Sequence, residues 1–198
     1  MGTTTAAILM TKLQKAMGDD KAAYADKYLD ALNDAAEDLY PILFKPVDDR
    51  TSVTAVAGTY EYVLPTAFQT GHLSKVFYQP SGSTIWEPVF GWKVITLVDG
   101  SKYLQITDSI AGSVELNGYT KFETLTTDVS TISLEGAKLS LLIAQAVIRV
   151  YERKRGVVSM DSRARYDEEL AYWRYKVEEL KGRHQMMKPA GQIRWRDW

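Results

Sequence analysis

The feature that most constrains the fold is the stretch SLEGAKLSLLIAQAVIRVYERKRG at residues 133–156. Its Leu, Ile, Ala and Val residues would occupy almost every side of a helix until the basic end. A helix that is apolar on most faces belongs at the centre of a core. The cations at 153–155 complement the helix dipole, and Gly156 is predicted to be the C-cap. The rest of the chain must therefore supply helices that surround this one.

Two such helices are predicted in the first forty residues. A short helix covers residues 6–17, and a longer one runs from an N-cap at Asp19 or Asp20 to Tyr40. Pro41 ends the longer helix, because proline cannot donate a backbone hydrogen bond. The apolar face of this helix consists of Tyr24, Tyr28, Leu32, Ala35 and Leu39.

A last helix begins near Ser159 or Asp161 and is predicted to end at Gly182. Its apolar positions follow a four-three-four-three spacing, which is typical of a helix packed along its length on another helix. These helix–helix core positions are Tyr166, Leu170, Trp173, Val177 and Leu180. The residues from Gln185 onward have neither a helical nor a strand period.

The middle of the chain, residues 51–127, has β character. GTYEYVLP alternates as a half-buried strand does, and Asp99-Gly100 separates two further apolar runs. Asn117-Gly118 lies between β-rich segments and predicts a hairpin turn. Five or six strands are expected, in a small antiparallel sheet or sandwich.

The predicted fold class is therefore α+β. A helical bundle core is interrupted by an antiparallel β insertion, which is tolerable because the entropy of loop closure grows slowly with length. The expected segments are N-terminal helices at 1–48, the β insertion at 49–130, C-terminal helices at 131–184 and an extended arm at 185–198.

The net charge of −1 conceals an asymmetry along the chain. Residues 138–198 contain 14 Lys and Arg against eight Asp and Glu, a net of +6, whereas residues 1–137 contain ten against 17, a net of −7. Such polarity can attract a second copy or an oppositely charged partner. The alternative interpretation is that the helices happen to be basic and the loops acidic.

Residue types that perform catalysis are scarce. The chain has no cysteine and two histidines, His72 and His184, in no metal-ligand spacing. The acidic pairs at 19–20 and 48–49 are interpreted as a helix cap and a solvated loop. We therefore predict no catalytic residue, no metal and no cofactor. The N-terminal stretch resembles neither a signal peptide nor a membrane span, so synthesis in the cytoplasm and no membrane partner are expected.

Two groups of residues are candidates for binding. Aromatic rings that could stack on sugars or bases are Tyr78, Trp86, Phe90 and Trp92. The alternative is that these rings fill the core of the β region. A basic cluster that could meet phosphates consists of residues 153–155, Arg163 and Arg165. Pairing of these cations with Glu152 and Asp161 is the alternative.

The whole chain resembles the head–tail connector (adaptor) proteins of tailed bacteriophages. The similarity lies in the helix ending ALNDAAEDLYP, the β segment opening YEYVLPTAF, the apolar helix LSLLIAQAVIRVYERKRG and the last helix RYDEELAYWRYKVEELKGR. The resemblance implies a structural protein of the virion neck. Its expected partners are further copies in a ring, usually dodecameric, the portal, a downstream neck or tail protein, and passing DNA bound without sequence specificity.

The resemblance also gives a role to the basic, aromatic end of the chain, which would be an arm that docks on the portal. Tryptophan and arginine often dominate interface energy, and Pro189 would keep the arm extended. The arm residues are Gln185, Met186, Met187, Lys188, Pro189, Ile193, Arg194, Trp195, Arg196 and Trp198. Two alternatives are another neck or tail-completion protein, and a DNA- or carbohydrate-binding protein that uses the β-region aromatics.

Overall fold

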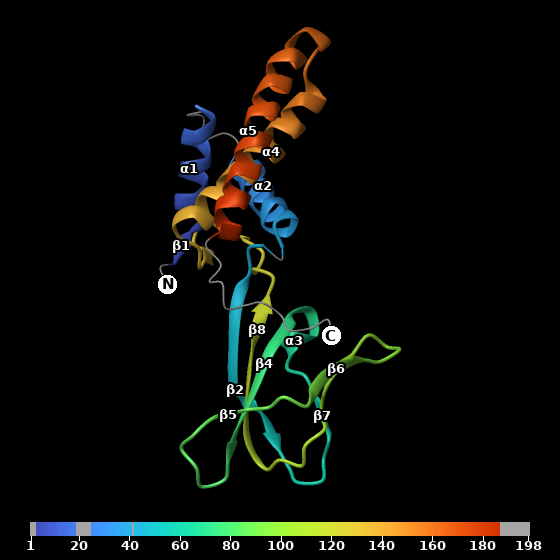
Figure 1. The fold of residues 1–198 in the computed structure, drawn as a ribbon. Helices are drawn as coiled ribbons and strands as arrows, with labels where there is room; N and C mark the ends of the chain where they lie inside the picture. The colour runs from blue at the N-terminus through green and yellow to red at the C-terminus, as the bar shows by residue number, and fades with distance from the viewer. Residues whose placement is uncertain (1–2, 19–24, 41, 187–198) are drawn as a thin grey trace. The chain divides into compact units, whose positions relative to one another are not determined.

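The computed structural model describes residues 3–18, 25–40 and 42–186 (Figure 1). The chain divides into two compact units. One unit is helical and combines Met1–Leu43 with Phe122–Trp198, and the other is the β unit, Phe44–Lys121. The predicted α+β class, a helical core interrupted by an antiparallel insertion, is confirmed. The insertion was expected at 49–130, so the β unit begins and ends earlier in the sequence than predicted.

The helical unit is built around one central helix. Its elements are β1 (Thr4–Thr5), α1 (Ala6–Met17), α2 (Ala25–Asp38), β9 (Thr131–Ile132), α4 (Gly136–Val157) and α5 (Met160–Met186). Helix α4 packs against α1, α2 and α5. The short strands β1 and β9 pair antiparallel, which joins the start of the chain to the segment before α4. The apolar segment at residues 133–156, which forms α4, therefore lies at the centre of the helical unit, as predicted.

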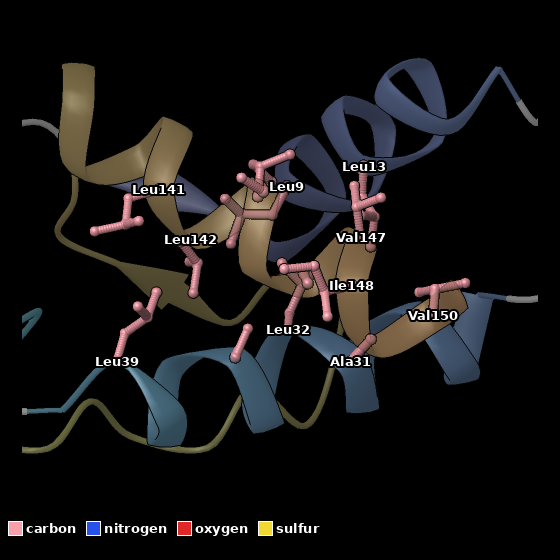
Figure 2. Close-up of a cluster of buried hydrophobic side chains, with 14 of the residues drawn as sticks. Leu9, Leu13, Ala31, Leu32, Leu39, Leu141, Leu142, Val147, Ile148 and Val150 are labelled. Carbon is pink, nitrogen blue, oxygen red and sulfur yellow. The ribbon is translucent and has the colours of Figure 1, made fainter. Parts of the chain in front are cut away.

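Burial in this unit follows the predicted helical periods. Figure 2 shows Leu9 and Leu13 of α1 and Leu32 of α2 beside Leu142 and Val147 of α4. All five side chains are fully buried. Each buried aliphatic side chain contributes roughly 1.5–3 kcal/mol relative to an exposed one. The predicted α2 face is confirmed by the burial of Tyr28, Leu32, Ala35 and Leu39, whereas Tyr24 lies outside the described residues.

The β unit contains two antiparallel sheets and a short helix. Its elements are β2 (Lys45–Ala55), β3 (Glu61–Val63), α3 (Thr66–Thr70), β4 (His72–Pro80), β5 (Glu87–Pro88), β6 (Trp92–Thr96), β7 (Lys102–Ile106) and β8 (Gly112–Thr120). One sheet has the order β2-β8-β4-β5 and the other the order β3-β7-β6. Their buried core includes Phe68, Leu104, Ile106 and Leu116.

One predicted turn in this unit is confirmed and another is wrong. Asp99-Gly100 connects β6 to β7, with Gly100 at a φ of 84°. Asn117-Gly118 instead lies inside the continuous strand β8, which is hydrogen-bonded to β2 and β4 on its two sides. A Cβ at Gly118 would lie 2.1 Å from the carbonyl oxygen of His72. The glycine therefore serves a close approach of two strands rather than a turn.

Three further expectations about element boundaries are wrong. Asp48 and Asp49 belong to strand β2, not to a loop. Gly156 and Gly182 lie within α4 and α5, so neither ends its helix. A glycine inside a helix costs only about 1 kcal/mol relative to alanine, so a single glycine does not have to end a helix.

Gly156, which lies inside α4, and Gly18, which follows the last residue of α1, together test these boundaries. We expect Gly156→Ala to raise the free energy of unfolding by about 0.5 kcal/mol, because alanine restricts the unfolded chain and fits a helix. Gly18 is the C-cap of α1 with a φ of 62°, so Gly18→Ala should lower it by about 1 kcal/mol. Urea unfolding followed by circular dichroism at the helical band measures both. A destabilising Gly156→Ala would mean that Gly156 is a cap after all.

Candidate functional site

The described residues contain no arrangement suited to catalysis by a metal. No three His, Cys, Asp or Glu side chains in this part of the chain come together as ion ligands. His72 is exposed at the start of β4, where its ring lies 4.9 Å from that of Tyr119, centroid to centroid. The side chain of His184 lies outside the described residues. No described helix is both long enough and apolar enough to cross a membrane. The candidate sites are therefore surfaces and charged contacts.

Charged residues join α2 to α4 in a regular ladder. Asp34 and Asp38 are four residues apart on α2, and Arg149 and Arg153 are four apart on α4, so each pair lies on one face of its helix. Arg149 donates two parallel hydrogen bonds to Asp38, one of them from Nε to Oδ2 at 2.6 Å. Arg153 donates from Nη2 to Oδ2 of Asp34, also at 2.6 Å. The two helices are thereby held in one register.

The same ladder continues onto α5. Arg149 bonds Glu152 at 3.0 Å, and Glu152 accepts a further bond from Arg174 of α5 at 3.0 Å. Arg155 forms an ion pair with Asp167 of α5 at 2.5 Å. The carboxylates of α2, α4 and α5 thus neutralise several cations of α4 within the unit.

This ladder includes two members of the basic cluster at residues 153–155, Arg163 and Arg165. Arg153 and Arg155 are paired with carboxylates of their own chain, which favours a structural role over contact with phosphates. Asp34 and Asp167 are the partners of Arg153 and Arg155, whereas Glu152 pairs with Arg149 and Arg174. The side chain of Asp161 lies outside the described residues. Part of the charge asymmetry along the sequence is therefore neutralised inside the helical unit, where acidic residues of α2 pair with arginines of α4.

The ladder shifts the pKa values of its members. The hydrogen bond from Arg149 lowers the pKa of Asp38 below its ordinary value, against the opposing effect of burial. The same hydrogen bond raises the pKa of Arg149. The Asp38 side chain is 27% exposed, so solvent screens this pair only in part.

A depressed carboxyl pKa makes part of the stability depend on pH. The Asp38 contribution is fully present above the unfolded pKa of about 3.9 and is lost as the pH falls through the lower folded pKa. We expect Asp38→Asn to lower the free energy of unfolding by about 1–2 kcal/mol at pH 7. This difference from the wild type should shrink as the pH approaches 3. Urea unfolding of both proteins across this range measures it.

Asp34→Asn is a matched control, because its carboxylate is more exposed and should contribute less. A gap between wild type and Asp38→Asn that stayed constant from pH 7 to pH 3 would contradict the assigned pKa shift.

The candidate aromatic residues of the β unit do not form one stacking platform. Trp92 packs on the buried core, whereas Phe90 is 87% exposed. Trp86 lies under the guanidinium of Arg50 at 5.9 Å from its ring centroid. Tyr78 donates a hydrogen bond to Glu87 at 2.9 Å, which raises the pKa of the phenol. Within the described residues, no ring of these four contacts another. The arrangement favours the structural interpretation for Trp92.

An exposed apolar surface of the β unit was missed from the sequence. Between residues 85 and 98, several large side chains face solvent, and Val98 at the β6–β7 turn is fully exposed. These exposed side chains, called here together the apolar rim, are Ile85, Phe90, Val94, Leu97 and Val98. Val94 lies in β6, the edge strand of its sheet, and the other four lie in the segments between strands. In the sequence, the apolar run WKVITLV at residues 92–98 has the composition of a buried strand. The sequence alone therefore did not indicate that several of these side chains are exposed.

The predicted helix–helix positions on α5 contact the core of the helical unit. Leu170, Val177 and Leu180 are buried, and Tyr166 and Trp173 pack against the same cluster while half-buried. Helix α5 includes Gln185 and Met186, the first two residues of the expected arm, because the helix does not end at Gly182. The remaining arm residues, from Met187 to Trp198, lie outside the described residues.

Comparison with known proteins gives one family and several distant structural likenesses, one of which is described here. The family model described as SU10 adaptor protein matches residues 4–187. Among solved structures, a chain from the neck of an empty GTA particle, computed with C6 symmetry, is similar at 14% sequence identity. That match covers 77% of this chain and 84% of the other, with a TM-score of 0.33. No curated protein matches the chain. The assignment to a family therefore rests on the family model.

Proposed function

Because the chain belongs to the SU10 adaptor protein family, we propose that it forms a ring below the portal, connects the phage head to the tail and extends the DNA channel. Membership of the family confirms the resemblance expected from the sequence and, with it, a structural role in the virion. The observation that supports the proposal most is the extent of the match, which spans both units of the chain.

The proposed ring is an assembly of copies in head-to-tail contact, with twelve as the expected number. Such contacts use two different surfaces of each copy, and they close into a ring when the rotation allows. The helical unit suits this role, because its ladder and core hold α2, α4 and α5 as one rigid body. A rigid subunit is needed where a small angular error would prevent closure.

The proposed portal contact is the arm that follows α5. Its sequence, MKPAGQIRWRDW, offers two tryptophans and two arginines beyond the last residue of the helix. Tryptophan and arginine are enriched among residues that dominate interfaces. Repetition of one weak contact around a ring raises the total affinity through avidity.

The apolar rim is the proposed contact with a downstream neck or tail protein. Its five side chains are large, apolar and exposed in the β unit, and contact with a partner would remove them from water. DNA is proposed to pass without sequence-specific contact. The internal pairing of Arg153 and Arg155 supports this, since paired cations hold phosphates weakly.

Removal of the arm tests the proposed function. We expect a chain ending at Met186 to keep the circular dichroism of the wild type and to lose assembly with the portal encoded by the same genome. Mass photometry of each protein, alone and mixed with that portal, measures assembly. The variant Trp195→Ala/Trp198→Ala is the matched control, since it removes the proposed anchors and leaves the chain length unchanged. Wild type that never joins the portal would refute the portal contact.

The second candidate, a DNA- or carbohydrate-binding protein, makes a different prediction. Trp86→Ala would then abolish ligand binding and leave assembly with the portal unchanged. A panel of duplex DNA and oligosaccharides, measured by calorimetry at two salt concentrations, separates the two functions. A tail-completion protein, the other alternative, would join tail components in the same mass measurement and ignore the portal.

A further inference from the structure

Helix α5 has an outer face with aromatic side chains in addition to the face that packs on α4. Tyr172 is 57% exposed and Tyr175 is 72% exposed. With Glu168 and Ala171, also exposed, they follow the spacing i, i+3, i+4, i+7, so all four lie on one side of the helix. We call these four residues the outer α5 face. Among the described residues, Glu168 forms no ion pair.

Helix α1 has an outer face with the same spacing and the opposite charge. Ile8, Thr11, Lys12 and Lys15 lie at i, i+3, i+4 and i+7, and all are exposed. Ile8 is 49% exposed although the opposite side of α1 is buried in the core. We call these residues the outer α1 face. Helix α1 contains no acidic residue, and neither lysine forms an ion pair within the part of the chain that the structure describes.

The two outer faces belong to different surfaces of one subunit. Helix α4 packs against both α1 and α5, and each outer face lies on the side of its helix that does not contact this core. A contact between the two faces therefore joins one copy to the next. Contacts between unlike surfaces are heterologous, the kind from which rings are built.

We propose that the outer α1 face of one copy packs antiparallel on the outer α5 face of the next copy. Ile8 and Lys15 are seven residues apart on α1, as Glu168 and Tyr175 are on α5. The antiparallel arrangement therefore puts Ile8 opposite Tyr175 and Lys15 opposite Glu168. A parallel arrangement puts Ile8 against Glu168 and loses the ion pair. The inference rests on the proposed ring and specifies its interface.

A second copy fits these faces better than a different protein does, because the complementarity lies within the chain. The α1 face supplies only positive charge and an aliphatic side chain, and the α5 face supplies a carboxylate and two tyrosines. Tyrosine is enriched at interfaces, where its ring buries area and its hydroxyl stays hydrogen-bonded. A single Lys–Glu pair at such a contact sets orientation and register more than affinity.

Reversal of this charge pair is the first test. We expect Lys15→Glu and Glu168→Lys each to lower the assembled fraction about tenfold in the portal mixture, since like charges oppose the contact. The double variant Lys15→Glu/Glu168→Lys should restore assembly, an outcome that a change in subunit stability would not give. Lys93→Glu, which reverses an exposed charge of β6, is the matched control. Failure of the double variant to recover assembly would overturn the pairing.

Cysteine cross-linking is the second test, and the chain is suited to it because it contains no cysteine. We expect Ile8→Cys/Tyr175→Cys, treated with a short bismaleimide, to give a ladder of dimers, trimers and larger species on denaturing gels. Ile8→Cys/Val157→Cys is the control, since Val157 is 88% exposed at the end of α4. A product cross-linked within one chain, or no ladder, would overturn the pairing.

The two tests separate this inference from the proposed function. Wild type that joins the portal while the cysteine pair gives no ladder rejects the α1–α5 pairing alone. Wild type that ignores the portal rejects the portal contact, and the ladder still reports whether copies join through these two helices.

Discussion

The burial of α4 is the constraint on which the helical unit depends. Nine of its side chains, from Leu141 to Tyr151, are buried, so no single neighbour can shield the helix from water. Helices α1, α2 and α5 each cover part of it. Because α1 and α2 precede the β unit and α5 follows it, the two ends of the chain must meet around α4. This requirement explains how an insertion of the length of Phe44–Lys121 is compatible with one continuous core.

Apolar burial alone would leave the register of these helices loosely defined, since the hydrophobic effect is not directional. The ladder from Asp34 and Asp38 to Arg149 and Arg153, and onward through Glu152 to Arg174, supplies direction. Its bidentate Arg149–Asp38 pair fixes both distance and angle. Arg153 and Arg155, two of the cations considered for contact with nucleic acid, are thus part of what holds the three helices together.

Three parts of the chain are proposed here as contacts of an adaptor protein. These are the unlike outer faces of α1 and α5, the exposed apolar side chains of the β unit, and the proposed arm from Met187 onward. Their compositions differ: charged and aromatic on the helices, apolar in the rim, and basic with tryptophan in the sequence after Met186. Different compositions suit different partners, since specificity is a difference between affinities.

The sequence by itself determined the features that depend on local periodicity. It predicted the central position of α4, the buried face of α2 at Tyr28 and Leu32, the α5 positions such as Leu170, and the Asp99-Gly100 turn. Only the tertiary structure decided which segments pair. Strand β8 passes straight through Asn117-Gly118 because β2 and β4 bond it on both sides. Helix α4 runs one residue past Gly156, to Val157, because a single glycine weakens a helix by only about 1 kcal/mol. The pairing of Asp38 with Arg149, 111 residues away, depends on where the helices meet, and no local pattern contains that information.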